Sequence, residues 1–325
     1  MSHAIRFHKT GGPEVLQWED VKIGEPGQGE VRVANKAVGL NYIDTYHRSG
    51  LYPVQLPSGI GLEAAGVIEA VGPGVTEFKA GDRVAYCNAT LGAYSEMKIH
   101  QAERLVKIPE GVSFEQAACA MLQGLTVQYL LRRLLRVPQA GETVLFHAAA
   151  GGVGLIACQW AKAVGVNVIG TVSSEDKAKL ARENGCTHTI IYTKEDVVAR
   201  VKEITGGKGV PVAYDGVGKD TFMKSLDCLQ PRGLLALFGN ASGPVDALNT
   251  GLLAQKGSLY VTRPTLMSYV GKREELVAAS KELFDHILAG RIKVGARQSY
   301  ALKDAAQAHR DLEARKTTGS TILVP

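Results

Sequence analysis

The chain has 325 residues, of which 45% are hydrophobic and 21% are charged, and its formal net charge at pH 7 is +5. This length exceeds what one hydrophobic core usually serves, so two domains are expected. The mild charge includes no long basic run, so nucleic acid is not the expected partner. The five cysteines are scattered and never form a CxxC pair, which argues against a disulfide framework and a zinc knuckle. Because no apolar leader and no long apolar stretch occurs, a soluble cytoplasmic protein is expected.

The N-terminal part of the chain has the pattern of short strands separated by turns. Apolar and polar residues alternate over 30–38, 66–71 and 82–86, between glycines and prolines that mark turns. The first long helix is predicted only at 115–135, with Ser113 as its N-terminal cap. This pattern predicts an antiparallel, barrel-like domain.

After Gly141 the pattern changes to an alternation of strands and helices. A buried strand is predicted at 143–147, a helix at 155–164 and a second strand at 166–172, which together form a βαβ unit. The alternation continues with helices at 175–184, 195–205 and 221–229 and strands at 189–192, 212–215 and 234–238. Such alternation is typical of an α/β protein with a doubly wound parallel sheet.

The C-terminal tail is predicted to contain a helix at 273–289, a short helix at 305–312 and a strand at 320–324. It is too short and too mixed to form a core of its own. We therefore expect it to fold back onto the first domain.

A glycine cluster, AAGGVG at 149–154, lies between a predicted strand and a predicted helix. This context is typical of a dinucleotide fingerprint, here with Ala149 in place of its first glycine. Gly151 would let the backbone approach the pyrophosphate, and Gly154 would let helix and strand pack closely. A glycine-rich turn without a ligand is the alternative. The predicted phosphate contacts are Ala150, Gly151, Gly152 and Val153.

The residue type at the end of the second strand of this unit favours NADPH over NADH. An NAD site usually has Asp or Glu about twenty residues after the glycines, and Ser173 lies there in this chain. Ser173 and Ser174 can donate hydrogen bonds to a 2′-phosphate, and Lys177 can neutralise it. These residues can equally form a plain helix cap with a solvated lysine, and capping is compatible with phosphate binding.

Three further groups of residues narrow the prediction. They are GLEAAG at 61–66 followed by Val71-Gly72 and GDRV at 81–84, NYIDTY at 41–46, and HAAAGGVG at 147–154. With these motifs the chain resembles, over essentially its whole length, the bacterial zeta-crystallin-like quinone oxidoreductases, a zinc-free branch of the medium-chain dehydrogenase/reductase superfamily.

The resemblance implies a GroES-like catalytic domain of residues 1–125 and 264–325 and an inserted Rossmann domain of residues 126–263 that binds NADPH. It also implies a homodimer formed by edge pairing of the Rossmann sheets near 259–262, and NADPH:quinone oxidoreductase activity. By resemblance alone, further cofactor contacts are Asn41, Thr126, Tyr192, Val217, Phe238, Asn240, Ser242 and Arg315.

The metal ligands of the zinc-dependent relatives are replaced in this sequence. By resemblance, their cysteine, histidine and cysteine correspond here to Asn41, Leu62 and Gln123, and leucine cannot coordinate a metal. Glu63 could be a ligand in principle, but one carboxylate without partners makes a poor site. Between Gly81 and His100 only one cysteine occurs, so the four-cysteine structural lobe is missing too. We therefore expect no zinc.

Without a Lewis acid, alcohol oxidation loses its main catalyst, whereas a quinone accepts a hydride readily. The expected reaction is therefore quinone reduction by NADPH, with cofactor and acceptor stacked in a cleft between the domains. Asn41 would orient the nicotinamide or the acceptor, and Tyr46 or Tyr52 could donate a hydrogen bond to the acceptor oxygen or simply pack in the barrel. The candidate catalytic residues are Asn41, Tyr46, Tyr52 and Gln123.

Two other functions fit parts of the sequence. An NADPH-dependent reductase of 2-alkenals or enones shares the fold, the cofactor and the lack of zinc, and differs in needing a proton at carbon. A nucleotide-bound RNA-binding or structural crystallin-like protein is an alternative of another class, which the mild charge disfavours. His47, His100 and His147 are interpreted as structural residues.

Overall fold

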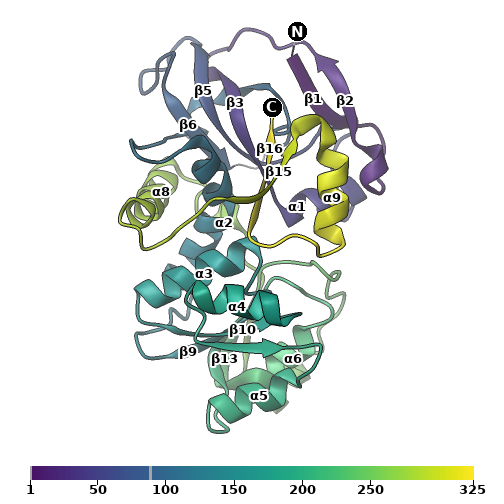
Figure 1. The fold of residues 1–325 in the computed structure, drawn as a ribbon, viewed down its shortest axis with the longest axis vertical. Coiled ribbons are helices and arrows are strands. Elements are labelled where there is room, and N and C mark those ends of the chain that lie inside the picture. The colour runs from purple at the N-terminus through teal and green to yellow at the C-terminus, as the bar shows by residue number, and fades with distance from the viewer. Residues whose placement is uncertain (1, 88–89) are drawn as a thin grey trace. The chain divides into compact units, whose positions relative to one another are not determined.

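The computed structural model describes residues 2–87 and 90–325. The chain divides into two compact units, and the ribbon of each is drawn in Figure 1. The first unit comprises residues 1–125, 270–290 and 294–325, and the second comprises residues 126–269 and 291–293.

The first unit is built around β3 (Glu30–Leu40), the longest strand of its larger sheet. Among the described residues this sheet has seven strands, in the order β15-β16-β3-β5-β6-β8 with β7 also paired to β3. The partners are β5 (Glu63–Val71), β6 (Arg83–Cys87), β7 (Met97–Gln101), β8 (Val106–Lys107), β15 (Ala296–Ala301) and β16 (Ser320–Val324). The terminal strand β16 runs antiparallel to β3, with Ile322 opposite Gly39, so the tail contributes to the sheet of the first unit.

A smaller sheet of the same unit has the order β2-β1-β4 in the described part of the chain. Its strands are β1 (Ser2–Phe7), β2 (Gln17–Val21) and β4 (Ser58–Gly59). Phe7 from β1 is fully buried in the same core as Val33 from β3 and Tyr94. Burial of each such large side chain contributes about 1.5–3 kcal/mol, which is why both sheets and their connections form one core.

The helices of the first unit are α1 (Tyr42–Ser49), α8 (Arg273–Leu288), α9 (Ala305–Glu313) and the start of α2 (Phe114–Arg132), with short 3-10 turns at Pro13–Val15, Ala102–Arg104 and Leu302–Asp304. The predicted cap of α2 is confirmed, because the backbone N–H of Gln116 donates to Ser113 Oγ over 3.1 Å. The prediction of only strands and turns before 115 is wrong at α1. That helix begins because Asp44 Oδ2 accepts the backbone N–H of Asn41, and it ends at Gly50 with a φ of 84°.

The second unit contains a parallel sheet of six strands, in a part of the chain that is described throughout. The strands are β9 (Thr143–Phe146), β10 (Asn167–Val172), β11 (His188–Ile191), β12 (Val210–Asp215), β13 (Leu229–Leu237) and β14 (Tyr260–Thr262). Their order is β11-β10-β9-β12-β13-β14, so the chain winds outwards from β9 in both directions. The predicted doubly wound sheet is confirmed, and its switch point lies between β9 and β12, where such sheets bind ligands.

Helices connect these strands (Figure 1), and all except the short helix at 251–255 lie where the sequence pattern predicts them. They are α3 (Gly152–Ala163), α4 (Glu175–Glu183), α5 (Val197–Ile204), α6 (Phe222–Cys228) and α7 (Gly251–Gln255), followed by a 3-10 turn at Leu266–Ser268. Among the described residues, no helix is both long enough and apolar enough to cross a membrane.

Candidate active site and cofactor site

A buried chain of polar side chains connects four segments of the first unit. Asn41 follows β3 and caps α1, Glu63 begins β5, Gln123 lies on α2 and Ser320 begins β16. Ser320 Oγ donates to Gln123 Oε1 over 2.8 Å, and Gln123 Nε2 donates to Asn41 Oδ1 over 3.1 Å. Asn41 Nδ2 in turn donates to Glu63 Oε2 over 2.6 Å. The structure therefore brings together two of the predicted catalytic residues, Asn41 and Gln123.

Glu63 anchors this chain from a fully buried position. Its other oxygen, Oε1, accepts the backbone N–H of Leu122 over 2.6 Å. Burial raises the pKa of Glu63 to about 8, against the opposing effect of these hydrogen bonds. Asp44, which accepts the backbone N–H of Asn41, is also fully buried, and burial raises its pKa to about 7. Asn41 is thus held by two carboxyl groups whose ionisation lies near neutral pH.

The tyrosines predicted to face the acceptor lie on and just after α1. The rings of Tyr46 and Tyr52 meet edge to face with centroids 5.2 Å apart, and the backbone N–H of Tyr52 donates to the carbonyl of Tyr46 over 3.0 Å. Tyr42 packs against Tyr46 at 5.8 Å. Tyr46 is 7% exposed. The three tyrosines therefore cluster on and after α1, the helix that Asn41 caps.

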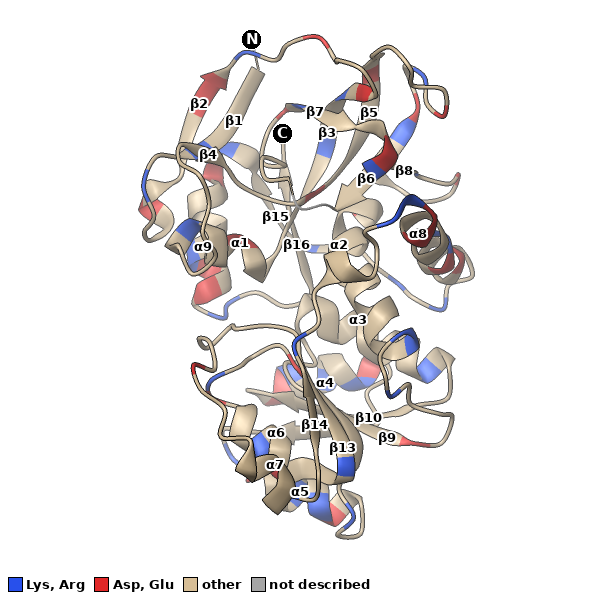
Figure 2. Cartoon of the chain, turned by 180° about the vertical axis from the view of Figure 1, so that it is seen from behind, with Lys and Arg blue, Asp and Glu red and all other residues tan. Residues whose placement is uncertain are grey.

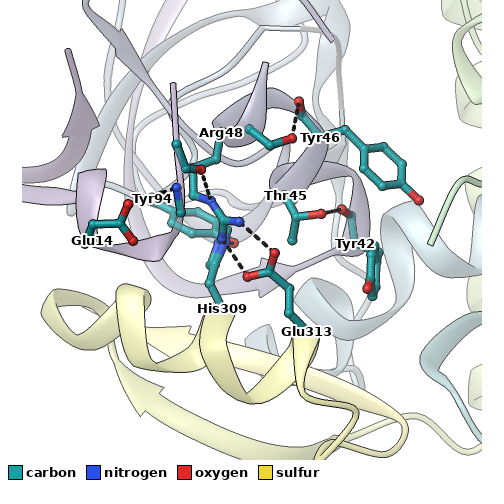
Figure 3. A network of polar contacts seen from close by, with 11 residues as sticks. Glu14, Tyr42, Thr45, Tyr46, Arg48, Tyr94, His309 and Glu313 are labelled. Atoms are coloured by element: carbon teal, nitrogen blue, oxygen red, sulfur yellow. Dashed lines mark hydrogen bonds and ion pairs between the residues drawn. The ribbon is translucent and has the colours of Figure 1, made fainter. Parts of the chain in front are cut away.

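A polar network fixes α1 against α9 (Figure 3). The buried guanidinium of Arg48 donates to both oxygens of Glu313, over 2.7 and 3.0 Å, and contacts His309 Nδ1 at 2.9 Å. Tyr94 Oη donates to Asp44 Oδ2 over 2.8 Å and lies 3.2 Å from His309 Nε2. Burial lowers the pKa of His309 to about 3, so its ring is neutral and Nδ1 accepts from Arg48.

The glycine cluster of the second unit forms a tight turn from β9 into α3. Gly151 is the cap residue of α3, and Ala148 adopts a φ of 56°. A Cβ at Gly154 would lie 2.4 Å from the carbonyl oxygen of Ala148, so only glycine lets the helix pack this closely on the turn. The N–H groups at the start of α3 belong to the predicted phosphate contacts Gly152 and Val153.

Four of the five residues predicted near the 2′-phosphate, all except Arg315, follow the carboxyl ends of β10 and β11. Ser174 is the N-cap of α4, and its hydroxyl accepts the backbone N–H of Lys177. Ser173 precedes it directly, and its carbonyl accepts the hydroxyl of Thr193 over 3.0 Å. Tyr192 follows the neighbouring strand β11 and is 41% exposed. The capping interpretation of Ser174 is confirmed, and the side chains of Ser173 and Lys177 are partly exposed beside it.

A second group of predicted cofactor contacts follows β12 and β13. Ser242 donates to the carbonyl of Val217 through both its backbone N–H, over 2.8 Å, and its hydroxyl, over 2.9 Å. The N–H of Phe238 donates to the carbonyl of Asp215 over 2.8 Å. Asn240, between these residues, is 9% exposed. The two segments therefore form one hydrogen-bonded rim at the switch-point side of the sheet.

The remaining predicted cofactor contacts do not belong to this rim. Thr126 lies on α2 and is 7% exposed. Asn41 and Arg315 belong to the first unit, where Arg315 follows α9 with a φ of 58°.

His147 has a structural role, as the sequence predicts. Its ring is buried between Thr171 Oγ1 and Ser225 Oγ, each 2.9 Å away. Ser225 donates to Asp215 Oδ2 over 2.7 Å, so its oxygen accepts from His147 Nε2–H. This chain joins β9, β10 and α6 below the glycine turn.

No group of three or more His, Cys, Asp or Glu side chains that could hold a metal ion occurs in residues 2–87 and 90–325. At the positions that correspond to the zinc ligands of related dehydrogenases, Asn41 and Gln123 bind each other and Leu62 is buried. Amide groups engaged in hydrogen bonds and an aliphatic side chain are a poor donor set for zinc.

Sequence reasoning missed Glu63, Asp44 and Ser320 as site residues. Glu63 had a visible signal, because it is the only charged residue in the apolar run GLEAAG. Asp44 had one as well, since Asn41 and Asp44 have the spacing of a capping pair. Nothing local marks Ser320, which reaches the site only because β16 pairs with β3.

Comparisons with known proteins identify the family of the chain. Residues 27–110 match the family model of the alcohol dehydrogenase GroES-like domain, and residues 152–284 match that of the zinc-binding dehydrogenases. The chain is 60% identical to a quinone oxidoreductase of Pseudomonas aeruginosa and 48% identical to a 2-haloacrylate reductase of Burkholderia, covering all of this chain in both cases and 100% and 99% of those proteins.

A solved structure of Escherichia coli quinone oxidoreductase complexed with NADPH superposes with a TM-score of 0.98 at 55% identity, over 100% of both chains. The predicted combination of a GroES-like domain and a Rossmann-type parallel sheet is therefore confirmed. The resemblance stated from the motifs is confirmed as well, and the chain belongs to the quinone oxidoreductase family.

Proposed function

We propose that this protein is an NADPH:quinone oxidoreductase that works without zinc. The observation that carries the proposal is the Asn41–Gln123 pair, in which two amides bind each other at positions that hold metal ligands in related dehydrogenases. Such a site offers hydrogen bonds to a carbonyl oxygen and no Lewis acid for an alcohol. It suits an acceptor that is already electron-poor, and the family relationship supports the same substrate class.

NADPH supplies the hydride when it is bound. In the proposed site, Ala150, Gly151, Gly152 and Val153 bind its pyrophosphate, Ser173, Ser174, Lys177, Tyr192 and Arg315 bind the adenosine 2′-phosphate end, and Thr126, Val217, Phe238, Asn240 and Ser242 line the remainder. Two observations support this assignment. The backbone N–H groups at the N-terminus of α3 are suited to binding phosphate, and position 173 is a serine and not an acidic residue. The NADPH complex of the related Escherichia coli enzyme supports the choice of cofactor.

The first unit supplies the polar groups for the acceptor. We assign Asn41 and Gln123 to orienting the quinone or the nicotinamide, because one N–H of each amide is already fixed by a buried partner. Tyr46 or Tyr52 donates a hydrogen bond to the quinone oxygen as negative charge develops there. The corresponding division of the chain is a substrate domain of residues 1–125 and 264–325 and a cofactor domain of residues 126–263.

The test is the rate of NADPH oxidation with a benzoquinone, a naphthoquinone and a 2-alkenal as alternative acceptors. The proposal expects the quinones to be reduced much faster than the alkenal. A protein that reduces the alkenal and leaves both quinones unchanged would contradict it.

Reduction of an activated carbon–carbon double bond is the second candidate function. The 48% identity to a 2-haloacrylate reductase favours keeping it. Hydride addition to an enal leaves an enolate that needs a proton at carbon, so this reaction depends on an acid more strictly than quinone reduction does. Tyr46→Phe and Tyr52→Phe discriminate the two, since a loss of turnover of about a hundredfold or more points to the double-bond reaction.

We also propose a cytoplasmic homodimer that pairs through β14. This strand is the last of its sheet order, and Tyr260 on it is 52% exposed. A partner strand would pair the backbone groups of that edge. Light scattering during gel filtration measures the molecular mass and so tests the dimer.

Nucleic acid is not proposed as a partner, because Lys and Arg are interspersed with Asp and Glu over both units (Figure 2).

A further inference from the structure

All hydrogen bonds of the buried chain in the first unit point in one direction. Ser320 donates to Gln123, Gln123 donates to Asn41, and Asn41 donates to Glu63. The chain ends at Glu63, whose two oxygens accept from Asn41 Nδ2 and from the backbone N–H of Leu122. A carboxyl group that only accepts is the ionised form, so this direction corresponds to a negatively charged Glu63.

The same four side chains can form the opposite chain. A protonated Glu63 must donate from the oxygen that faces Asn41, and a half-turn of the Asn41 amide places its oxygen there as acceptor. Gln123 then turns in the same way, and Ser320 accepts from it. The hydroxyl proton of Ser320 also has an acceptor, because the carbonyl oxygen of Cys119 lies 3.3 Å from Ser320 Oγ. In both arrangements each of the four side chains has its hydrogen-bond partners. The two arrangements differ by one proton, which is bound to Glu63 in only one of them.

We propose that Glu63 is a positioning residue that sets the direction of this hydrogen-bond chain, and thereby whether Asn41 and Gln123 turn a donor or an acceptor towards the bound quinone. The inference rests on the proposed function for the identity of the ligand. The arrangement of the chain itself depends only on the hydrogen bonds within the first unit. A half-turn of a planar amide exchanges its oxygen and nitrogen, so it replaces an N–H by a lone pair on the side that the ligand meets.

The surroundings of Glu63 make both forms accessible. The titratable groups that face it are Asp44 from α1, Cys87 from β6, Cys119 from α2 and Tyr94, all of which are neutral or anionic. Burial is the main reason that the pKa of Glu63 rises to about 8, and the nearby Asp44 raises it further. On β3 the residue paired with Glu63 is Gly39, which has no side chain, and a Cβ there would lie 2.4 Å from Glu63 Oε2.

One substitution fixes the chain in a single direction. In Glu63→Gln the side-chain oxygen has to accept the N–H of Leu122, so the new NH₂ group faces Asn41 and can only donate. In this variant the amides of Asn41 and Gln123 therefore have, at every pH, the orientation that they have in wild type when Glu63 is protonated. Asp44→Asn is the matched control, since it removes a buried carboxyl group that accepts from Tyr94 Oη and contacts Asn41 only through the backbone N–H.

The experiment combines a spectroscopic titration with a kinetic one, both on the full chain. The side-chain amide ¹⁵N resonances of Asn41 and Gln123 are followed between about pH 6 and about pH 10 in wild type, Glu63→Gln and Asp44→Asn. We expect both amides of wild type to shift together in one transition near pH 8, to stay constant in Glu63→Gln, and to shift at lower pH in Asp44→Asn. Amide resonances that do not respond to pH in wild type would overturn the inference, and this outcome needs no variant.

The kinetic titration measures kcat/KM for benzoquinone with saturating NADPH over the same pH range. We expect a change of about tenfold across the transition in wild type, the size of one hydrogen bond to the acceptor. Glu63→Gln should keep the low-pH value throughout, and Asp44→Asn should retain the change. A wild-type change that persists unaltered in Glu63→Gln would overturn the positioning role. If the amide resonances shift with pH as expected but neither wild type nor the variants reduce quinone, the proposed function is wrong. The pH-dependent direction of the hydrogen-bond chain is then still supported.

Discussion

Arg48 and Glu313 form a two-point ion pair, with contacts of 2.7 and 3.0 Å, in which the arginine side chain is 3% exposed and the glutamate side chain is 36% exposed. The pair joins α1, which begins directly after Asn41 and carries Tyr46, to α9 near the C-terminus (Figure 3). Arg48 also donates to the carbonyl of Gly11 over 3.1 Å. The placement of α1, and of the candidate catalytic residues on it, therefore depends on a residue close to the far end of the chain.

Replacement of Glu313 should be costly for this reason. Glu313→Ala leaves the buried Arg48 guanidinium without its carboxylate, and we expect a loss of about 3 kcal/mol in the free energy of unfolding. Urea denaturation measures it. Glu313→Gln, which keeps one acceptor, is the control and should lose less. Equal stability of Glu313→Ala and wild type would contradict the importance assigned to the pair.

Substitution of Gly154 should weaken cofactor binding more than it disturbs the fold elsewhere. The Cβ of Gly154→Ala meets the backbone of Ala148 and Ala149 at 2.4 to 2.7 Å, and backbone cannot rotate away as a side chain can. We expect the affinity for NADPH to fall about tenfold or more as the turn before α3 shifts, measured by fluorescence titration. Gly295→Ala is the matched control, because its Cβ would have nothing within 4 Å. A similar affinity in both variants would argue against the role of the turn.

The choice between NADPH and NADH should depend on Ser173. Ser173→Asp places a carboxylate where the 2′-phosphate is proposed to bind, and the two negative charges repel. We expect the ratio of kcat/KM with NADPH to that with NADH to fall by about a hundredfold, which corresponds to about 2.7 kcal/mol. Ser173→Ala separates the loss of the hydroxyl from the added charge and should change the ratio less. If Ser173→Asp leaves the ratio of kcat/KM with NADPH to that with NADH unchanged, the 2′-phosphate does not bind beside Ser173.

The stability of the protein should decline as the pH rises towards 8. Burial raises the folded-state pKa of Asp44 to about 7 and that of Glu63 to about 8, above their ordinary values. Between the unfolded and folded pKa values the folded state binds more protons than the unfolded state, so the free energy of unfolding falls with rising pH. The two protonated carboxyl groups contribute their full stabilisation of the folded state at a pH below their ordinary pKa values. This contribution decreases as the pH rises and is lost by about pH 7 to 8.

Urea denaturation of wild type, Asp44→Asn and Glu63→Gln at acidic and alkaline pH measures this dependence. Each substitution should flatten the curve, because an amide does not titrate. The flattening should be on the order of 1 kcal/mol or more for each residue. Curves of equal slope in all three proteins would mean that these carboxyl groups are ionised throughout.

The periodicity of the sequence was sufficient for the second unit. Buried strands and amphipathic helices alternate there at regular spacing, so β9 to β13 and the helices between them could be predicted to within three residues, except that β13 begins at Leu229 and not at 234. The glycine turn was recognisable for the same reason, since its position between β9 and α3 follows from local pattern alone. Its ligand contacts remain a prediction.

The first unit was harder to predict because its organisation is not local. The helix α1 has only eight residues, five of them charged or polar besides its two tyrosines, so its apolar face is too short for a periodic signal. The buried chain is assembled from β3, β5, α2 and β16, which come from distant parts of the sequence. The contact of Asn41 with Glu63 became visible only once the pairing of β3 with β5 was known. The contact of Gln123 with Ser320 likewise required the pairing of β16 with β3.

NADPH is expected to reduce a quinone on this protein without a metal. The most direct measurement is the initial rate of NADPH oxidation with a naphthoquinone by protein dialysed against EDTA, with the metal content determined on the same sample. We expect full activity with less than about one zinc ion per ten chains. Activity that disappears on dialysis and returns on addition of zinc would contradict it.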